Sequence, residues 1–161
     1  MIRKATFKDI PRLLEIFEYA KGFMKNTGNP NQWTDQYPGP KFETEVKEGL
    51  IYVMEDEEHI YGVFLLNIGT DPTYSYIEGG KWLNDTVPYG TIHRVASDGS
   101  HKGILKEIVE YSLTKVDNLR IDTHEDNLVM QNAILKEGFK YCGVIYLENG
   151  DPRLAYQMEI N

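Results

Sequence analysis

The sequence predicts one mixed α/β domain that spans residues 1–161. An amphipathic helical pattern follows a very short opening strand, and apolar strand-like segments separated by polar turns fill the middle of the chain. Two further helical patterns alternate with strands in the second half. The expected order is strand, helix, short helix, three strands, helix, strand, helix and two strands. The chain shows no repeat, low-complexity stretch or linker that would divide it.

The first helix has the clearest pattern. It follows an opening strand at residues 2–5, and Thr6 and Asp9 have the spacing of a capping box, with Pro11 in the first turns. We expect this helix to end near residues 25–28. Its apolar residues recur at helical spacing and are Ile10, Leu13, Leu14, Phe17, Ala20 and Met24.

Turn-rich and strand-like segments alternate in the middle of the chain. Residues 28–41 are rich in turn formers, and two polar turns join later segments. The expected elements here are a short helix at 42–48, a hairpin of strands at 50–55 and 59–68, an irregular segment at 69–88 and a strand at 89–97.

The second half returns to helical patterns. A polar turn at 98–103 precedes apolar residues at helical spacing from Ile104 onwards, and Asp126–Asn127 can cap a later helix that Gly138 stops. The remaining expected elements are strands at 119–123, 139–147 and 153–159, the last two forming a hairpin.

Charge and cysteine usage limit the function classes. The net charge of −8 disfavours non-specific nucleic-acid binding, and it weakly favours cationic small molecules or basic peptides as ligands. The single cysteine, Cys142, excludes an intramolecular disulfide and favours a reducing compartment. The start turns polar at once and no apolar run reaches membrane-spanning length, so we expect a cytoplasmic protein without membrane association.

The segment from Ile92 to Tyr111 carries the most chemical information. A strand that feeds a glycine-containing turn at a helix start presents unpaired N–H groups and the positive end of a helix dipole. A phosphate or pyrophosphate is the natural ligand of such a site. The turn lacks both the dinucleotide fingerprint and the Walker A loop. Taken alone, an ordinary polar turn before a helix is the commoner explanation.

The same segment resembles the acetyl-CoA loop of the GNAT family of N-acetyltransferases. That family carries R/Q-x-x-G-x-G/A at the start of its central helix. Here the window runs from Ser100 to Leu105; Gly103 matches a motif position, whereas Ser100 replaces Arg or Gln and Leu105 replaces the second small residue.

Two other segments resemble the family in the same order along the chain. Asn127 and Met130, followed by Gly138 and Phe139, resemble its N-x-x-A…G-F segment, and the opening residues 2–9 resemble its first strand and helix start. The resemblance covers essentially the whole chain. It implies a GNAT-like fold: a twisted, mixed but mostly antiparallel sheet of about six or seven strands with splayed central strands, flanked by about four helices.

The resemblance also implies acetyl-CoA as co-substrate, with no metal. Its arm would lie between the splayed strands, and backbone amides at the helix start would hold the pyrophosphate. An oxyanion would be stabilised by a backbone N–H of the splayed strand. The implied cofactor-binding residues are Val95, Ala96, Ser97, Ser100, His101, Lys102, Gly103, Ile104, Leu105, Asn127 and Met130.

The acid–base residues depart from the family. GNAT enzymes often carry a Tyr four residues before the Gly of G-F, but this position is Ile134, so Tyr141 or Tyr146 would have to serve as the acid. His93 and His124 are the candidate bases because histidine titrates near neutral pH. For each histidine, a surface or capping role is the alternative. Cys142, alone in an apolar strand, is more simply a buried small residue than a nucleophile.

The acceptor side should be formed by the loop after the first helix and by residues 69–89. Aromatic residues there, at Trp33, Tyr37, Tyr74, Tyr76 and Trp82, either cage an amine or ring, or plug the core beneath the loops; both interpretations stay open. Arg94 and Arg153 are candidates to hold an acceptor carboxylate, with surface roles as the alternative.

The sequence therefore predicts an N-acetyltransferase that moves an acetyl group from acetyl-CoA to a primary amine of a small molecule, an amino acid or a peptide. The alternatives are a non-catalytic acyl-CoA sensor and an α/β interaction module without a cofactor. Many GNAT proteins dimerise, so a homodimer is compatible with the resemblance. No metal ligand set is evident: Asp122–Asp126 lacks the paired His or Cys spacing of a metal site.

Overall fold

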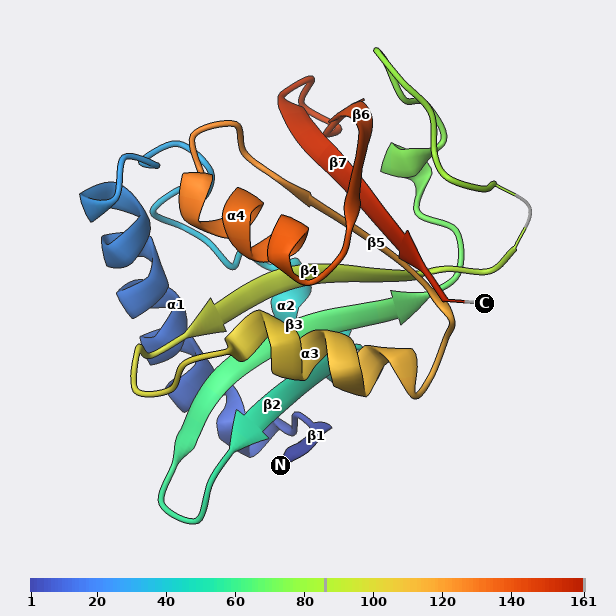
Figure 1. Cartoon of the computed structure of the whole chain (residues 1–161). Helices are drawn as coiled ribbons and strands as arrows, with labels where there is room; N and C mark the ends of the chain where they lie inside the picture. Colours follow the sequence, from blue (N-terminus) through green and yellow to red (C-terminus); the bar gives the residue numbers. More distant parts are fainter. Residues whose placement is uncertain (86, 161) are drawn as a thin grey trace.

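The computed structural model describes residues 1–85 and 87–160, and in this part of the chain seven strands form one sheet with four α-helices around it (Figure 1). The strand order is β1-β2-β3-β4-β5-β7-β6, and of these described strands only β4 and β5 pair in parallel. The strands are β1 (Ile2–Lys4), β2 (Ile51–Glu55), β3 (Ile60–Ile68), β4 (Gly90–Ser97), β5 (Asn118–Thr123), β6 (Lys140–Tyr146) and β7 (Pro152–Glu159). The helices are α1 (Ile10–Asn26), α2 (Lys41–Lys47), α3 (Ile104–Leu113) and α4 (Leu128–Lys136), with 3₁₀ turns at Phe7–Asp9 and Pro72–Tyr74. The predicted mixed α/β fold is confirmed.

The capping box predicted at Thr6 and Asp9 closes a 3₁₀ turn before α1. The Thr6 N–H donates to Asp9 Oδ2 at 2.8 Å, and Arg3 donates to both Asp9 oxygens at 2.8 and 3.0 Å. The regular helix therefore starts at Ile10, after this turn.

Two apolar layers sandwich the sheet. The alternation of side chains along β2 sends Ile51 and Val53 to the layer with α1 and α2, and Tyr52 and Met54 to the layer with α3 and α4. All four residues are buried. A strand buried on both faces is apolar throughout, which explains why the sequence of β2 shows no polar alternation.

The parallel strands β4 and β5 separate after a short contact. They pair only from Gly90 with Leu119 to Ile92 with Ile121, although β4 continues to Ser97. On its other edge β4 is bulged, because Val63 pairs with Ala96 while Leu65 pairs with His93. Arg94 in the bulge has a φ of +56°, a left-handed value that is uncommon outside glycine. The split and the bulge open a cleft in the middle of the sheet.

Residues 69–85 and 87–89 form an irregular cover over β5, β6 and β7. Tyr74, Trp82 and Tyr89 are buried there with Cys142, and the Trp82 indole N–H donates to the Tyr74 carbonyl at 3.0 Å. The Arg120 guanidinium lies between the rings of Trp82 and Tyr89, 4.0 and 3.9 Å from their centres. Tyr74 and Trp82 therefore fill the core beneath the loop, the second of the two interpretations open from the sequence. Cys142 is buried as expected. Among the described residues, no helix has the length and apolarity to cross a membrane.

Candidate active site

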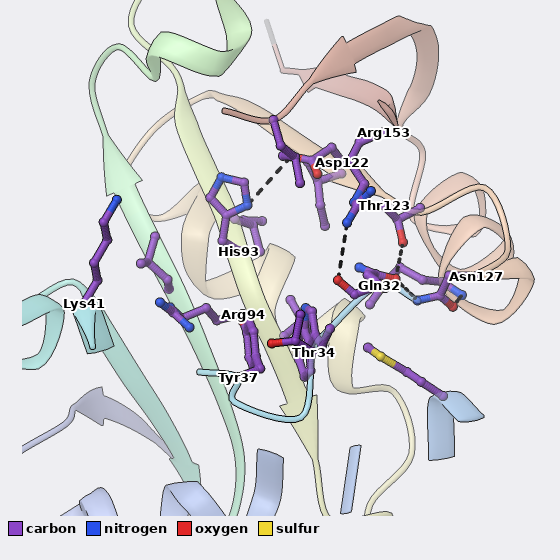
Figure 2. Close-up of a pocket in the computed structure, with 18 of the residues that line it drawn as sticks. Gln32, Thr34, Tyr37, Lys41, His93, Arg94, Asp122, Thr123, Asn127 and Arg153 are labelled. Atoms are coloured by element: carbon purple, nitrogen blue, oxygen red, sulfur yellow. Dashed lines mark hydrogen bonds and ion pairs between the residues drawn. The ribbon is translucent and has the colours of Figure 1, made fainter. Parts of the chain in front are cut away.

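Two adjoining cavities occupy the cleft between β4 and β5. The inner cavity, about 520 Å³, lies over His93 and Asp122, and the groove, about 420 Å³, runs past the start of α3. Met24, Val95, Asn127 and Met130 line both cavities, so the two cavities adjoin one another. Figure 2 shows His93 on β4, Asp122 on β5 and Arg153 on β7 around the inner cavity, with Gln32 in the loop after α1.

The groove is suited to an anionic ligand. Gly103 begins α3 with a φ of +70°, and the first N–H groups of a helix have no carbonyl of a preceding turn to donate to. Ile104, Leu105 and Lys106 present such groups at the groove, which Lys136 and Glu137 also line. The helix dipole favours negative charge at this helix start.

His93 lies in the inner cavity between two carboxylates. Its Nε2 is 3.2 Å from Asp71 Oδ2, and its Nδ1 is 3.7 Å from Asp122 Oδ2, too far for a hydrogen bond. An Nε2–H that donates to Asp71 leaves Nδ1 as the proton-accepting nitrogen. The side chain keeps 32% of its surface accessible. The ring is therefore fixed on one side and open on the other.

The two carboxylates set the protonation of this group. Burial lowers the pKa of His93, but the hydrogen bond to Asp71 and the charges of Asp122 and Asp71 outweigh burial and raise it. Burial raises the pKa of Asp71, but hydrogen bonds from His93 and Thr73 outweigh it and bring it to about 2. Asp71 therefore remains anionic beside His93 near neutral pH.

The loop between α1 and α2 closes one side of the inner cavity. Trp33 and Tyr37 stack with ring centres 3.8 Å apart, and both line the cavity. Gln32 ties this loop to the far wall, because its Oε1 accepts from Asn29 and Asn127 at 2.9 Å each. The loop thus forms a fixed wall of the cavity.

Comparison with known proteins adds independent information. The sequence matches no protein-family model and no curated protein at a significant level. Solved structures do match: an acetyltransferase of the GNAT family from Streptococcus agalactiae 2603 has a TM-score of 0.89 and 29% identity, with 100% of this chain and 95% of that chain covered. The chain belongs to the GNAT superfamily.

More distant structures share the GNAT fold. A GNAT-family acetyltransferase from Listeria monocytogenes 4b F2365 has a TM-score of 0.70 at 19% identity, covering 99% of this chain and 94% of its own. A chain of the NatC complex bound to Gag peptide and CoA has a TM-score of 0.62 at 14% identity. The match covers 100% of this chain and 98% of that chain. The relation to GNAT acetyltransferases supports acyltransferase activity in general.

Most of the residues that the GNAT resemblance implied for the cofactor line the groove. These are Val95, Ala96, Ser97, Gly103, Ile104, Leu105, Asn127 and Met130. Asn127 also caps α4, with its Oδ1 accepting from the Met130 N–H at 3.0 Å.

Ser100, His101 and Lys102 do not line the groove. The Ser100 N–H donates to Asp98 Oδ1 at 2.9 Å, so it is already used within the turn. His101 Nε2 is 2.9 Å from Asp56 Oδ2, and its ring packs 3.6 Å from that of Tyr61. These contacts bend the tip of the turn toward the β2–β3 hairpin, away from the groove.

Two of the three candidate catalytic residues lie outside both cavities. His124 follows β5, and its Nδ1 accepts from the Asp126 N–H at 3.0 Å, so the ring caps a local turn. Tyr141 is 51% exposed on β6, where it packs edge-on against Tyr156. Tyr146, also on β6, donates its hydroxyl hydrogen to the Glu78 carboxylate at 2.7 Å. Ile134 is fully buried in the core. Of the three, the structure brings only His93 into the cleft.

Some of the candidate acceptor residues line the inner cavity and others do not. Trp33, Tyr37 and Arg94 line the inner cavity, whereas Tyr74 and Trp82 are in the core. Arg94 is paired inside the protein, since its Nε donates to Glu45 at 2.6 Å and its Nη1 to the Pro38 carbonyl at 3.0 Å.

Sequence reasoning missed the partners of these residues. Asp71, Asp122 and Gln32 contribute to the cleft without belonging to any motif. Asp71 did leave a signal, because Asp before Pro72 and Thr73 is a helix-cap pattern, and its Oδ1 accepts from the Thr73 N–H at 2.9 Å.

Proposed function

We propose that this protein transfers an acetyl group from acetyl-CoA to a primary amine by direct attack in a ternary complex. The observation that carries the proposal is that the two cavities adjoin: a helix start suited to an anion lies at the groove, and a histidine–aspartate pair lies at the inner cavity. The relation to GNAT acetyltransferases, one of them bound to CoA, supports the same assignment.

The groove has the features that the co-substrate needs. The N–H groups at the start of α3 would hold the pyrophosphate, with Lys106 and Lys136 nearby. The backbone of β4 beyond Ile92 has lost its β5 partner, so its groups can pair with the amide-bearing arm. When bound, acetyl-CoA supplies an activated thioester.

His93 would act as the base at the acceptor end. Its Nδ1 would take the proton from the ammonium form of the acceptor, while the Nε2–H to Asp71 fixes the tautomer. Asp122, held by a 2.6 Å hydrogen bond from the Tyr74 hydroxyl, would stabilise the imidazolium that forms. The cysteine thiol, a related group, has a pKa of about 8.5, and a thiolate is a good enough leaving group to depart near neutral pH without a tyrosine acid. Proximity of the two substrates supplies part of the rate.

Binding of acetyl-CoA tests the proposal. Gly103→Trp would fill the groove at the helix start, where an added side chain meets open space, and should raise the Kd in calorimetry by more than about 100-fold. Gly150→Trp is the matched control, because Gly150 also has a positive φ and open space around it but lies in the β6–β7 turn. Both variants place a tryptophan at a left-handed φ, +70° at position 103 and +90° at position 150.

Two alternative functions predict different results for acetyl-CoA binding and turnover. The burial of Ile134 at the usual tyrosine position and the outward placement of Tyr141 favour a non-catalytic acyl-CoA sensor as the second candidate. A sensor would bind acetyl-CoA without turning over any amine. Failure of the wild type to bind acetyl-CoA would instead leave an interaction module and would refute the proposal.

Asp71→Asn should move the acid limb of the pH–rate profile to lower pH. In the wild type, kcat/KM should rise with pH as His93 loses its proton, since only the neutral imidazole accepts one. Asp71→Asn removes one of the two carboxylate charges that raise the pKa of His93, so the pKa falls and the neutral form persists to lower pH. The control is Asp126→Asn, which faces His124 outside the cleft. If the acid limb of the pH–rate profile does not move in Asp71→Asn, then Asp71 does not control the protonation of the catalytic base.

A further inference from the structure

Arg153 differs from the other arginines in having no carboxylate partner among the described residues. The chain has five arginines, and four of them lie within 3.1 Å of a carboxylate oxygen: Arg3 at Asp9, Arg12 at Asp98, Arg94 at Glu45 and Arg120 at Asp85. For Arg153, no carboxylate of the described residues lies within 4.0 Å. The sequence has 25 acidic against 17 basic residues, so a shortage of carboxylates does not explain this.

The Arg153 side chain is also buried. The residue is only 6% exposed, and it lines the inner cavity from β7 (Figure 2). Its Nη1 donates to the Pro152 carbonyl at 2.8 Å and its Nη2 to the Gln32 carbonyl at 3.3 Å. A guanidinium has five N–H donors, so donors remain for a ligand.

A buried guanidinium without a counter-ion is unfavourable. Burial lowers the pKa of Arg153, and the charges of Asp122 and Asp151 act against this from beyond ion-pair distance. Desolvation of an unpaired charge is costly, and a hydrogen-bonded anion restores the balance. The site is therefore complementary to an anion.

The carboxylates of the inner cavity are already committed elsewhere. Glu45 Oε1 accepts from Arg94 at 2.6 Å. Asp122 Oδ2 accepts from Tyr74 at 2.6 Å and faces His93. The missing anion must then come from a bound molecule.

We propose that the acceptor is a small primary amine that carries a carboxylate, with Arg153 binding this carboxylate while the amine lies at His93. The inference rests on the proposed function, because it names the class of substrate that the same cavity takes. Arginine matches a carboxylate with two parallel hydrogen bonds, which fixes orientation as well as affinity. A cavity of about 520 Å³ suits a small molecule of this kind.

Paired substrates test the inference. The standard L-amino acids and their α-carboxamides are nearly equal in size and differ in the negative charge, and acetylation of each pair by the wild type can be compared. The carboxamide also lowers the pKa of the amine, which by itself would favour the amide, so a preference for the acid reports the carboxylate. The preferred acid should exceed its amide in kcat/KM by about 10² to 10³-fold, as expected when a buried charge loses its partner. Arg153→Met should abolish this preference, and Arg153→Lys should restore part of it. Arg3→Met, whose guanidinium lies at the far edge of the sheet, is the control for loss of an arginine.

The outcomes separate this inference from the proposed function. Equal turnover of acids, amides and simple amines would overturn the role of Arg153 and leave the acetyltransferase assignment intact. If no amine is acetylated, calorimetry of the same amino acids gives a second measurement. Binding that is lost in Arg153→Met and kept in Arg3→Met would still support the carboxylate site, and absence of binding to the wild type would overturn it.

Discussion

Replacing His93 by Gln should lower kcat by about 10² to 10⁴-fold, the usual contribution of a positioned acid or base. Glutamine fills a similar volume and can still donate to Asp71, but it has no nitrogen that accepts a proton near neutral pH. The Kd of acetyl-CoA should remain unchanged, because His93 lines the inner cavity and not the groove. Steady-state kinetics with calorimetry on the same preparation measures both quantities.

His124→Gln is the matched control for this variant. His124 was an equal candidate from the sequence, but its ring caps the turn at Asp126 outside both cavities. Its replacement should leave kcat within about threefold of the wild type, a change of under 1 kcal/mol. Equal losses in the two variants, or a His93→Gln enzyme of normal rate, would contradict the assignment of His93 as base.

The order of elements could be predicted from the sequence because local signals agree along the chain. The apolar period of α1, the cap at Asn127 and the glycine that begins α3 each act within a few residues. The resemblance to the GNAT acetyl-CoA loop then placed the groove. Local geometry determines these features, so the sequence contains enough information to find them.

The catalytic pairing could not be predicted in the same way. Asp71 and His93 are 22 residues apart, and they meet only because the irregular segment after β3 folds back over β4. The same packing decides which aromatic residues line a cavity: Trp33 and Tyr37 face the cleft, whereas Tyr74 and Trp82 enter the core. Both loops combine turn-forming residues with Trp and Tyr, so the two interpretations could not be separated before the tertiary contacts were known.

Trp82 makes the largest expected contribution to stability of the residues in the irregular cover. Trp82→Ala should lower the free energy of unfolding by about 3 to 5 kcal/mol, the range for deleting a buried aromatic side chain. The ring is 7% exposed, packs 5.1 Å from Tyr74 and covers one face of the Arg120 guanidinium. Urea denaturation should show a lower midpoint with an unchanged m-value.

Two further variants separate the causes of this loss. Trp82→Phe keeps a ring over Arg120 but removes the N–H that donates to the Tyr74 carbonyl, so the hydrogen bond should account for about 1 kcal/mol of its destabilisation. Tyr76→Ala, in the same segment but 61% exposed, should cost less than about 1 kcal/mol. Because Tyr74 also holds Asp122 opposite His93, Trp82→Ala should reduce kcat as well as stability. A Trp82→Ala protein as stable as Tyr76→Ala would show that this cover does not pack as a core.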